Sequence, residues 1–316
     1  MPSCSADCPS RLGSLSEKTY EAAGVSLAAA EGVVERLRAA VESTGTKGFG
    51  AFAGLFPLDD DRFLAASMDS VGSKLTLARR ADRLRDAGRD LAAHCINDVI
   101  TTGAEPLFLL DYVAANTLDL EQVAQLVEGA AEVCREAACA LVGGETAELP
   151  GIYQPEEVDF AGTCVGIVGR AELIDGSRCA VGDVILGLPS SGLHTNGFSL
   201  VRALLGDDDF DPDLLLAPHR LYVREVRELR TRADVKALAH VTGGGIVGNL
   251  ARVLPDGVSA EIDWDAWERA PVYEWLTEHG VREDEQRRVF NCGIGMCAVV
   301  PPPDVRAADT VIGRLT

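Results

Sequence analysis

The stretch DLAAHCINDVITTGAEPLFLLDYVAA, residues 90–115, joins a predicted helix to a predicted strand. Apolar residues recur every four positions in its first half, which predicts a helix over about 90–102. Gly103 and Pro106 interrupt this pattern, and the apolar run that follows is typical of a buried strand. Helical and strand patterns alternate in the same way on both sides of this stretch. The sequence therefore predicts a layered α/β or α+β fold.

The length and composition allow two domains. The chain has 316 residues, of which 47% are apolar, enough for two cores. We place the domain boundary near Gly169, between an N-terminal domain (20–168) and a C-terminal domain (169–316). Residues 1–19 are rich in proline and serine and lack the apolar core of a secretory signal, so we expect a flexible tail. The chain has no apolar run long enough for a membrane span.

The formal net charge of −20 makes nucleic acid an unfavourable partner, because phosphate backbones would be repelled. The nine cysteines are scattered, odd in number and not arranged in C-x-x-C pairs or zinc-like clusters. This usage is typical of reduced thiols in the cytoplasm.

Several local signals define individual elements. Ser26 is a predicted N-cap, and Asp119 with Gln122 forms a capping box for a helix that should end near Ala138. The run CALVGG, residues 139–144, is a predicted strand that ends where the motif GGETAELPG begins.

Four carboxylates lie at the ends of predicted elements, beside small residues: Asp69, Asp90, Asp98 and Glu145. Each one alone could be a helix cap or a surface charge. Asp98, however, lies in an apolar helix next to Asn97, where a buried charge needs a cation or a strong donor. Carboxylate and amide oxygens suit Mg²⁺, which usually also bridges to phosphate. The acidic set therefore indicates a magnesium-nucleotide site.

Three glycine-rich stretches could hold phosphate. They are SVGSKL with Lys74, TGTKGFG with Lys47, and TGGGIVGNL, in which residues 243–245 open a predicted helix. None matches a P-loop or a dinucleotide-binding signature, so ordinary turn chemistry remains the alternative.

His194 lies in SSGLHTNGFSLVR, between a predicted strand and a predicted helix. We expect an exposed imidazole that acts as a general acid or base, or anchors a ligand. Alternatively, Thr195 or Asn196 caps the helix and His194 is passive. His94 is interpreted as structural, and no role is assigned to the remaining histidines: His219, His240 and His279.

Together these motifs resemble the phosphoribosylformylglycinamidine cyclo-ligase (aminoimidazole ribonucleotide synthetase) family, from Tyr20 to Met296. The stretch 98–106 fits the signature D-x4-G-A-x-P, which would also admit thiamine-phosphate kinase, selenophosphate synthetase and a hydrogenase-maturation factor. LVGGETAELPGIY and SSGLHTNGFSLVR are more specific to the cyclo-ligase.

The resemblance implies two α/β domains per subunit, with N-terminal sheets that pair into a barrel in a homodimer. It implies that ATP and Mg²⁺ activate the formyl oxygen of formylglycinamidine ribonucleotide, and that ring closure gives 5-aminoimidazole ribonucleotide, ADP and phosphate. The alternatives are another ATP-dependent kinase or synthetase of the superfamily, or a non-catalytic nucleotide-binding paralogue.

The resemblance also implies residue roles. The implied catalytic residues are Asp98, His194 and Lys74, and the implied metal ligands are Asp69, Asp98 and Glu145. The implied nucleotide-binding residues are Asp69, Gly72, Ser73, Lys74, Asp90, Asn97, Gly143, Gly144, Glu145 and Thr146. The implied substrate-binding residues are His194, Thr195, Asn196, Gly243, Gly244 and Gly245.

Three departures from the family pattern stand out. Ser70 replaces a glycine and would cost about 1 kcal/mol if the position needs a positive φ. Ala51 and Ala53 replace glycines of a nucleotide-facing loop. The sequence ends at Thr316, so we expect the C-terminal domain to lack the family's last strand.

Overall fold

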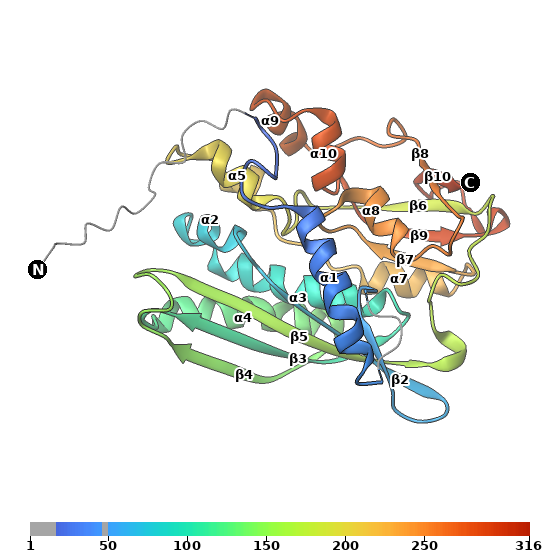
Figure 1. The fold of residues 1–316 in the computed structure, drawn as a ribbon, viewed down its shortest axis with the longest axis horizontal. Coiled ribbons are helices and arrows are strands. Elements are labelled where there is room, and N and C mark those ends of the chain that lie inside the picture. Colours follow the sequence, from blue (N-terminus) through green and yellow to red (C-terminus); the bar gives the residue numbers. More distant parts are fainter. Residues whose placement is uncertain (1–16, 46–49) are drawn as a thin grey trace, which may run out of the picture.

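The computed structural model describes residues 17–45 and 50–316, which form two five-stranded sheets with helices packed on them (Figure 1). The prediction of a layered, two-domain α/β fold is confirmed. Most of the predicted tail (1–19) and Lys47 lie outside the described residues. No helix in the described part of the chain has the length and apolar character needed to cross a membrane.

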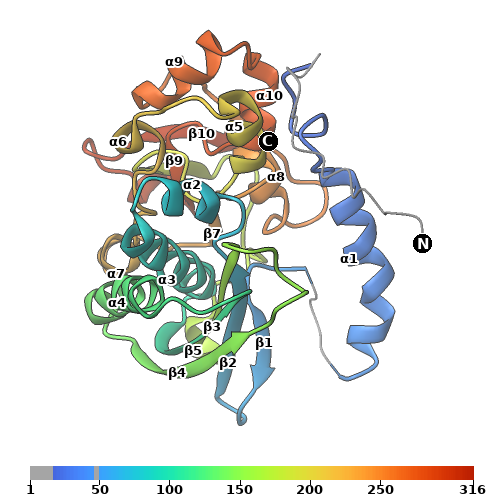
Figure 2. The same ribbon diagram turned by 90° about the vertical axis from the view of Figure 1, so that its left-hand side faces the viewer.

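The first sheet has the strand order β1-β2-β5-β3-β4, in which only β3 and β4 run parallel. Its strands are β1 (Gly54–Pro57), β2 (Arg62–Ser70), β3 (Glu105–Ala115), β4 (Ala140–Glu148) and β5 (Val158–Gly169). One face is covered by α2 (Lys74–Arg80), α3 (Leu84–Ile100) and α4 (Leu120–Ala137). Helix α1 (Leu27–Glu42) stands to one side of both sheets (Figure 2).

The second sheet has the order β7-β9-β6-β10-β8 and is antiparallel throughout. Its strands are β6 (Val184–Pro189), β7 (Ala237–His240), β8 (Ala260–Ile262), β9 (Ile294–Val300) and β10 (Val311–Leu315). The helices of this half are α5 (Phe198–Leu205), α6 (Pro212–Leu215), α7 (Val223–Arg230), α8 (Gly245–Ala251), α9 (Pro271–Glu278) and α10 (Glu283–Val289). The layer that contains α3 lies between the first sheet and this second domain (Figure 2).

The predicted N-caps Ser26 and Asp119 are confirmed. The side chain of Ser26 accepts a hydrogen bond from the amide of Ala29 at the start of α1. Asp119 accepts hydrogen bonds from two amides in the first turn of α4, and that helix ends at Ala138 in the left-handed conformation. Short polar side chains at these positions satisfy backbone donors that the helix itself cannot.

Two element boundaries were predicted incorrectly. Helix α3 begins at Leu84, six residues before the predicted start, because the buried Leu84 and Ala87 extend its apolar face. Strand β4 does not end at Gly144 but continues to Glu148, because residues 144–148 pair with residues 111–115 of β3. Gly143, with φ +140°, lies at the shift in register. The motif GGETAE is therefore part of an edge strand rather than a loop.

Helices α3 and α4 approach closely through two glycines. A Cβ atom on Gly88 would lie 2.0 Å from the carbonyl oxygen of Leu126, and one on Gly129 would lie 1.9 Å from that of Arg85. This contact packs α3 directly against α4, backbone to backbone. The residues of α3 that face the second domain are therefore carried by a rigid element.

Candidate active site between the two domains

A buried ion pair of the N-terminal domain binds a segment of the C-terminal domain. The ammonium of Lys74 lies 2.9 and 2.7 Å from the two carboxylate oxygens of Asp90 and donates to the carbonyl of Ala217 at 3.0 Å. The exposed fractions of Lys74 and Asp90 are 1% and 0%. Asp90 also accepts a hydrogen bond from the amide of His219 at 2.7 Å. The pair therefore fixes the segment 217–219 against α2 and α3.

Asn97 makes a second connection between the domains. Its amide nitrogen donates to the carbonyl of Arg220 at 2.8 Å, and its oxygen accepts from the amide of Tyr222 at 3.0 Å. Lys74, Asp90 and Asn97, which we expected to face ATP, thus have their polar groups engaged by the protein. In this structure they shape the site rather than line it.

Asp69 and Asp98 lie together at the junction of β2 and α3. The alternation of β2 turns Ser67 and Asp69 towards α3, where Ser67 donates to Asp98 at 2.8 Å and Asp69 lies 2.9 Å from Nε2 of His94. The second oxygen of Asp98 lies 2.7 Å from Nδ1 of His240. Burial raises the pKa of Asp69, but its interactions, chiefly with His94, outweigh burial and lower it.

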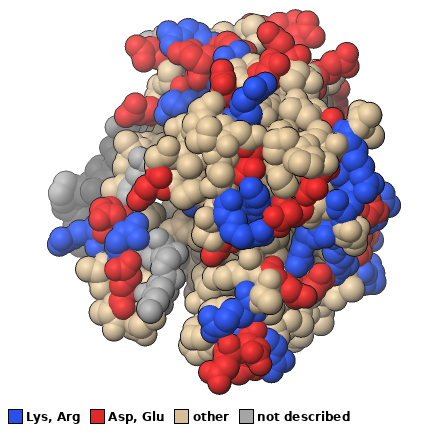
Figure 3. Space-filling view, turned by 90° about the vertical axis from the view of Figure 1, so that its right-hand side faces the viewer, with Lys and Arg blue, Asp and Glu red and all other residues tan. Residues whose placement is uncertain are grey.

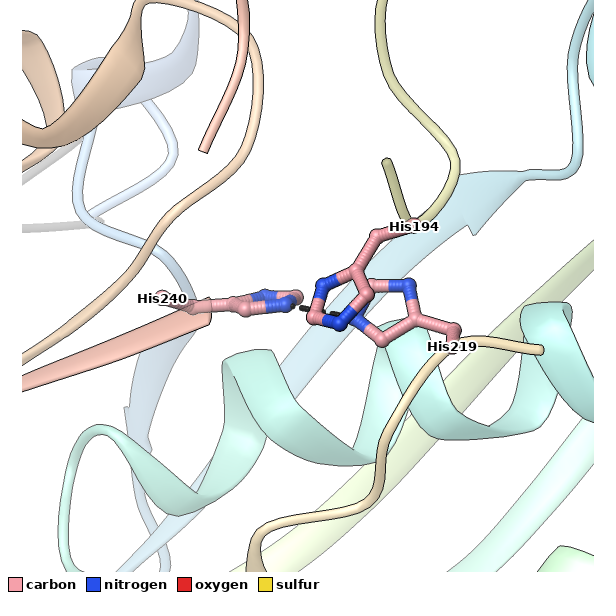
Figure 4. Close-up of side chains that lie close together, drawn as sticks. All are labelled: His194, His219 and His240. Atoms are coloured by element: carbon pink, nitrogen blue, oxygen red, sulfur yellow. Dashed lines mark hydrogen bonds between the residues drawn. The ribbon is translucent and has the colours of Figure 1, made fainter. Parts of the chain in front are cut away.

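Four of the five histidines converge here: His94, His194, His219 and His240. Three of them are drawn in Figure 4. His194 stacks on His219 with ring centroids 3.9 Å apart, and Nε2 of His219 lies 2.9 Å from Nε2 of His240. We assigned no role to His219 or His240 and interpreted His94 as structural. The structure brings all three, buried, to the candidate site.

Two of the overlooked histidines had a usable sequence signal. His94 precedes Asp98 by one helical turn, and His240 stands directly before the VTGGG motif. His219 had none, because only the tertiary fold brings the 217–219 segment to α3.

The histidines differ in charge. Burial lowers the pKa of His194 and His219 well below its usual value, and nearby cationic groups add to the effect. Burial also lowers the pKa of His94, but the carboxylate of Asp69 and other nearby carboxylates outweigh it and raise the value to about 8. At neutral pH the site therefore contains a charged His94 beside neutral His194 and His219.

His194 has a strained and unsatisfied geometry. Its φ is +62°, and its side chain is buried rather than exposed as we had expected. Its Nε2 accepts a long hydrogen bond from the amide of Ser191 (3.4 Å), which leaves Nδ1 as a buried donor without a partner. The amide nitrogen of Asn196 is also buried without a partner. Two unpaired donors in one turn are suited to an anionic or carbonyl oxygen of a ligand.

The alternative in which Thr195 or Asn196 caps the next helix does not hold. The N-cap of α5 is Gly197, and no side chain caps it. Thr195 instead contacts Nδ1 of His94 at 2.8 Å and Nδ1 of His219 at 3.4 Å.

The triple glycine begins α8 as predicted, with Gly244 as its N-cap. The amide nitrogen of Asn249 donates to the carbonyls of residues 242, 243 and 245 and so holds the turn in shape. A Cβ atom on Gly243 would lie 3.5 Å from the side-chain oxygen of Asn196. The glycine turn and the 194–197 turn therefore face each other.

A cavity of about 1080 Å³ lies beside this junction, between α1, the segment 50–55 and α8. Its lining includes Phe52, Thr101, Gly243, Gly244 and Arg252. The groove between α1 and the body is visible in Figure 3, on a face where acidic and basic side chains are mixed. Burial lowers the pKa of Arg252, while the charges of Asp98 and Asp69 oppose the shift. Arg252 lines the cavity and donates to the carbonyls of residues 50 and 51.

Four predicted site residues lie on the exposed edge strand β4: Gly143, Gly144, Glu145 and Thr146. Asp69 aligns with Gly162 on β5, which aligns with Asp111 on β3 and so with Gly144. Three steps between strands amount to about 14 Å. One chain therefore does not bring Glu145 to Asp69 and Asp98. Position 144 requires glycine for packing within the sheet, because a Cβ atom there would lie 2.1 Å from the carbonyl oxygen of Asp111.

Three further residues that we singled out, Ser70, Gly72 and Ser73, lie between the end of β2 and the start of α2. Gly72 has φ +62°, and the hydroxyl of Ser73 lies 3.2 Å from that of Ser199 at the start of α5. Ser70 ends β2 without a positive φ, so it carries none of the strain that we had considered.

Two sets of three side chains in the described part of the chain could approach one metal ion: His194, His219 and His240, and His94, Asp98 and His240. An imidazole binds a metal in the plane of its ring. The stacked rings of His194 and His219, inclined by only 22°, cannot both direct a nitrogen at one ion. In the second set, His240 and Asp98 already bind each other. The oxygens of Asp69 and Asp98 are the groups here that suit Mg²⁺.

The chain matches the family AIR synthase related protein in both halves, with the N-terminal domain over residues 50–168 and the C-terminal domain over residues 180–314. A protein from Oleidesulfovibrio alaskensis named phosphoribosylformylglycinamidine cyclo-ligase is 46% identical over 319 residues, covering 94% of this chain and 90% of that protein. The chain belongs to the phosphoribosylformylglycinamidine cyclo-ligase family.

Other comparisons agree with this assignment. A cyclo-ligase of the same name from Burkholderia cenocepacia is 43% identical over 318 residues, covering 94% of this chain and 89% of that one. Among solved structures, thiamine monophosphate kinase from Aquifex aeolicus in complex with AMPPCP and TMP has a TM-score of 0.66 at 18% identity, covering 88% of this chain and 89% of that one. A hydrogenase maturation protein has a TM-score of 0.63 at 21% identity, covering 83% and 82%. These two likenesses concern the fold.

Proposed function

We propose that the protein catalyses the ATP-dependent closure of formylglycinamidine ribonucleotide to 5-aminoimidazole ribonucleotide in purine biosynthesis. The observation that carries this proposal is the 46% identity to a cyclo-ligase along 94% of the chain, which includes both domains that build the site. In this reaction the γ-phosphoryl group of ATP passes to the formyl oxygen and ADP leaves. A substrate nitrogen then attacks the formyl carbon, phosphate departs, and a proton is lost.

The cavity beside α8 is the proposed nucleotide site. Its volume lies near the upper end of the range for small-molecule pockets, and its lining combines the aromatic Phe52 with the cation of Arg252. Mg²⁺, when bound, would neutralise phosphate charge. Asp69 and Asp98 would hold it, since carboxylate oxygens suit Mg²⁺ and the side chain of Asp69 is 38% exposed. Glu145 could join them only from another subunit.

The turns 194–197 and 243–245 are the proposed ribonucleotide site. The unpaired donors of His194 and Asn196 would bind oxygens of the substrate, and Gly243 leaves space for them. Holding the attacking nitrogen and the formyl carbon together supplies much of the rate enhancement in an intramolecular ring closure. We assign Asp98 and His194 to the reacting centre, and Lys74 to the support of the 217–219 segment.

A homodimer with the first sheets paired into a barrel is part of the proposal. The strand register puts Phe56, Met68 and Leu110 on the sheet face opposite α3 and α4, and all three are exposed. Such an apolar face favours burial against a second copy. We also propose a cytoplasmic location, consistent with the seven free, buried cysteines of the described part of the chain.

The test is turnover by the purified protein. With ATP, Mg²⁺ and formylglycinamidine ribonucleotide, we expect ADP and an aminoimidazole product in equal amounts, the latter measured by diazo coupling of its aromatic amine. ADP without aminoimidazole would identify a different kinase or synthetase. Tight ATP binding with no ADP would identify a non-catalytic paralogue. Either of these two results refutes the proposal.

A further inference from the structure

A continuous series of polar contacts crosses the domain junction. It runs from Asp69 to His94 (2.9 Å), through Thr195 (2.8 Å) to His219 (3.4 Å), and on to His240 (2.9 Å) and Asp98 (2.7 Å). The first and last members belong to the N-terminal domain, while Thr195, His219 and His240 belong to the C-terminal domain. His219 stands in the middle of the series.

The contacts determine which nitrogen of each ring carries a proton. Nδ1 of His240 faces the carboxylate of Asp98 and must donate to it, so Nε2 of His240 is an acceptor. Nε2 of His219 lies 2.9 Å from that acceptor and must therefore carry the proton. Nδ1 of His219 is then an acceptor, and it faces the hydroxyl of Thr195. The tautomer of His219 thus matches both of its neighbours.

His219 also supports His194. The ring centroids lie 3.9 Å apart, and Gly295 packs closely on the His194 ring, since a Cβ atom there would lie 2.4 Å from Cε1 of His194. His219 itself is held firmly, because Asp90 binds its amide and is in turn paired with the buried Lys74. The fixed ring of His219 therefore packs against the ring of His194, whose backbone has a strained, positive φ.

We infer that His219 is a positioning residue, whose ring fixes the orientation of His194 by stacking and the tautomer of His240 by hydrogen bonding. This inference rests on the proposed function in one respect: His194 is taken to face the ribonucleotide, and His240 to hold Asp98 at the reacting centre. Loss of either contact should impair the chemical step more than the binding of ATP, because ATP is proposed to bind in the cavity beside α8.

Two substitutions separate the two contacts. His219→Phe keeps a flat ring beside His194 but removes the donor to His240. His219→Gln keeps a donor at a similar distance but removes the stacked ring. His279 provides a matched control, since it stacks on Trp275 at the same 3.9 Å, yet is exposed just after the end of α9. His279→Gln should leave the kinetics unchanged.

Steady-state kinetics provide the first readout. We expect His219→Phe to lower kcat by about tenfold or more, as loss of a partner for a buried polar group implies, with KM for ATP within about twofold of the wild type. We expect His219→Gln to retain more activity than His219→Phe, but with a raised KM for the ribonucleotide. Equal losses in both variants, with KM for both substrates changed alike, would overturn the inference and leave a structural role.

Two-bond ¹H–¹⁵N spectra of protein labelled with ¹⁵N-histidine provide a second readout that needs no substrate. The five histidines give five patterns. We expect the rings of His194, His240 and His279 to carry a proton on Nδ1, because each one directs Nε2 at a donor or Nδ1 at an acceptor. The pattern of His240 is identified by its loss in His240→Asn, and we expect it to change in His219→Phe but not in His279→Gln. If His240 is protonated at Nε2, or is insensitive to His219→Phe, the inference fails even where turnover is normal. If turnover is absent but these spectra agree, the proposed function fails and the positioning role stands.

Discussion

Replacing Gly295 with alanine should damage the site through a single methyl group. Gly295 lies in β9, and a Cβ atom there would lie 2.0 Å from the hydroxyl of Tyr222 and 2.4 Å from Cε1 of His194. Both side chains are buried, and the hydroxyl of Tyr222 also donates to the carbonyl of Pro189 at 3.0 Å. The methyl group must therefore displace two packed rings.

The expected size follows from these contacts. Overpacking a buried site costs about 1–3 kcal/mol, and loss of the Tyr222 hydrogen bond adds about 1 kcal/mol. A total of about 3 kcal/mol should lower the melting temperature by roughly 6–12 °C. We also expect a larger KM for the ribonucleotide, because His194 is shifted. The assays are thermal unfolding and initial-rate kinetics on the same preparation.

Gly32→Ala is the matched control for this variant. Gly32 lies in α1, and a Cβ there would meet no atom within 4 Å, so alanine should be tolerated or slightly stabilising. A Gly295→Ala protein with the melting temperature and kinetics of the wild type would refute the packing that we describe around His194.

The remaining predictions concern charge and assembly. Asp98→Asn should abolish turnover while the melting curve keeps its cooperative shape, and normal rates would exclude Asp98 from the reacting centre. His194→Ala should raise KM for the ribonucleotide far more than KM for ATP; unchanged constants would show that it is a bystander. The pKa of His94 is about 8 in the fold against 6.5 as its reference value, so about 2 kcal/mol of stability should be fully present below pH 6.5 and lost as pH rises through 8. Urea unfolding at pH 6 and pH 9 measures this difference, which His94→Gln should remove. Co-expressed Asp98→Asn and Glu145→Gln subunits should regain about a quarter of wild-type turnover if Glu145 serves the partner's site, because half the dimers are mixed and each has one intact site; no recovery would confine Glu145 to another role.

The fold class was readable from the sequence because it depends on local periodicity and capping. Ser26 and Asp119 are satisfied within one helical turn, and each cap lies where the sequence places it. Strand β4 was misjudged because its extension through Glu148 depends on pairing with β3, a partner more than thirty residues away. A shift in register at Gly143 leaves no simple trace in a hydrophobic pattern.

In the candidate site, too, the sequence predicted residue types but not contacts between distant segments. We selected Asp69, Asp98 and His194 from the sequence because their side chains suit metal ions or phosphate. The structure brings these three to one junction. The sequence could not reveal that Lys74 is neutralised by Asp90, because that pairing depends on how α2 packs on α3. Nor could it find His219, whose position is set by contacts from the other domain.

The central claim is that the nucleotide occupies the cavity beside α8 while the ribonucleotide lies against the turns 194–197 and 243–245. A crystal structure of the protein with a non-hydrolysable ATP analogue, Mg²⁺ and formylglycinamidine ribonucleotide measures this directly. We predict the triphosphate near Arg252, a magnesium ion on Asp69 and Asp98, and the ribonucleotide hydrogen-bonded to Asn196. A triphosphate bound elsewhere, with that cavity empty and no magnesium ion on Asp69 and Asp98, would contradict the account.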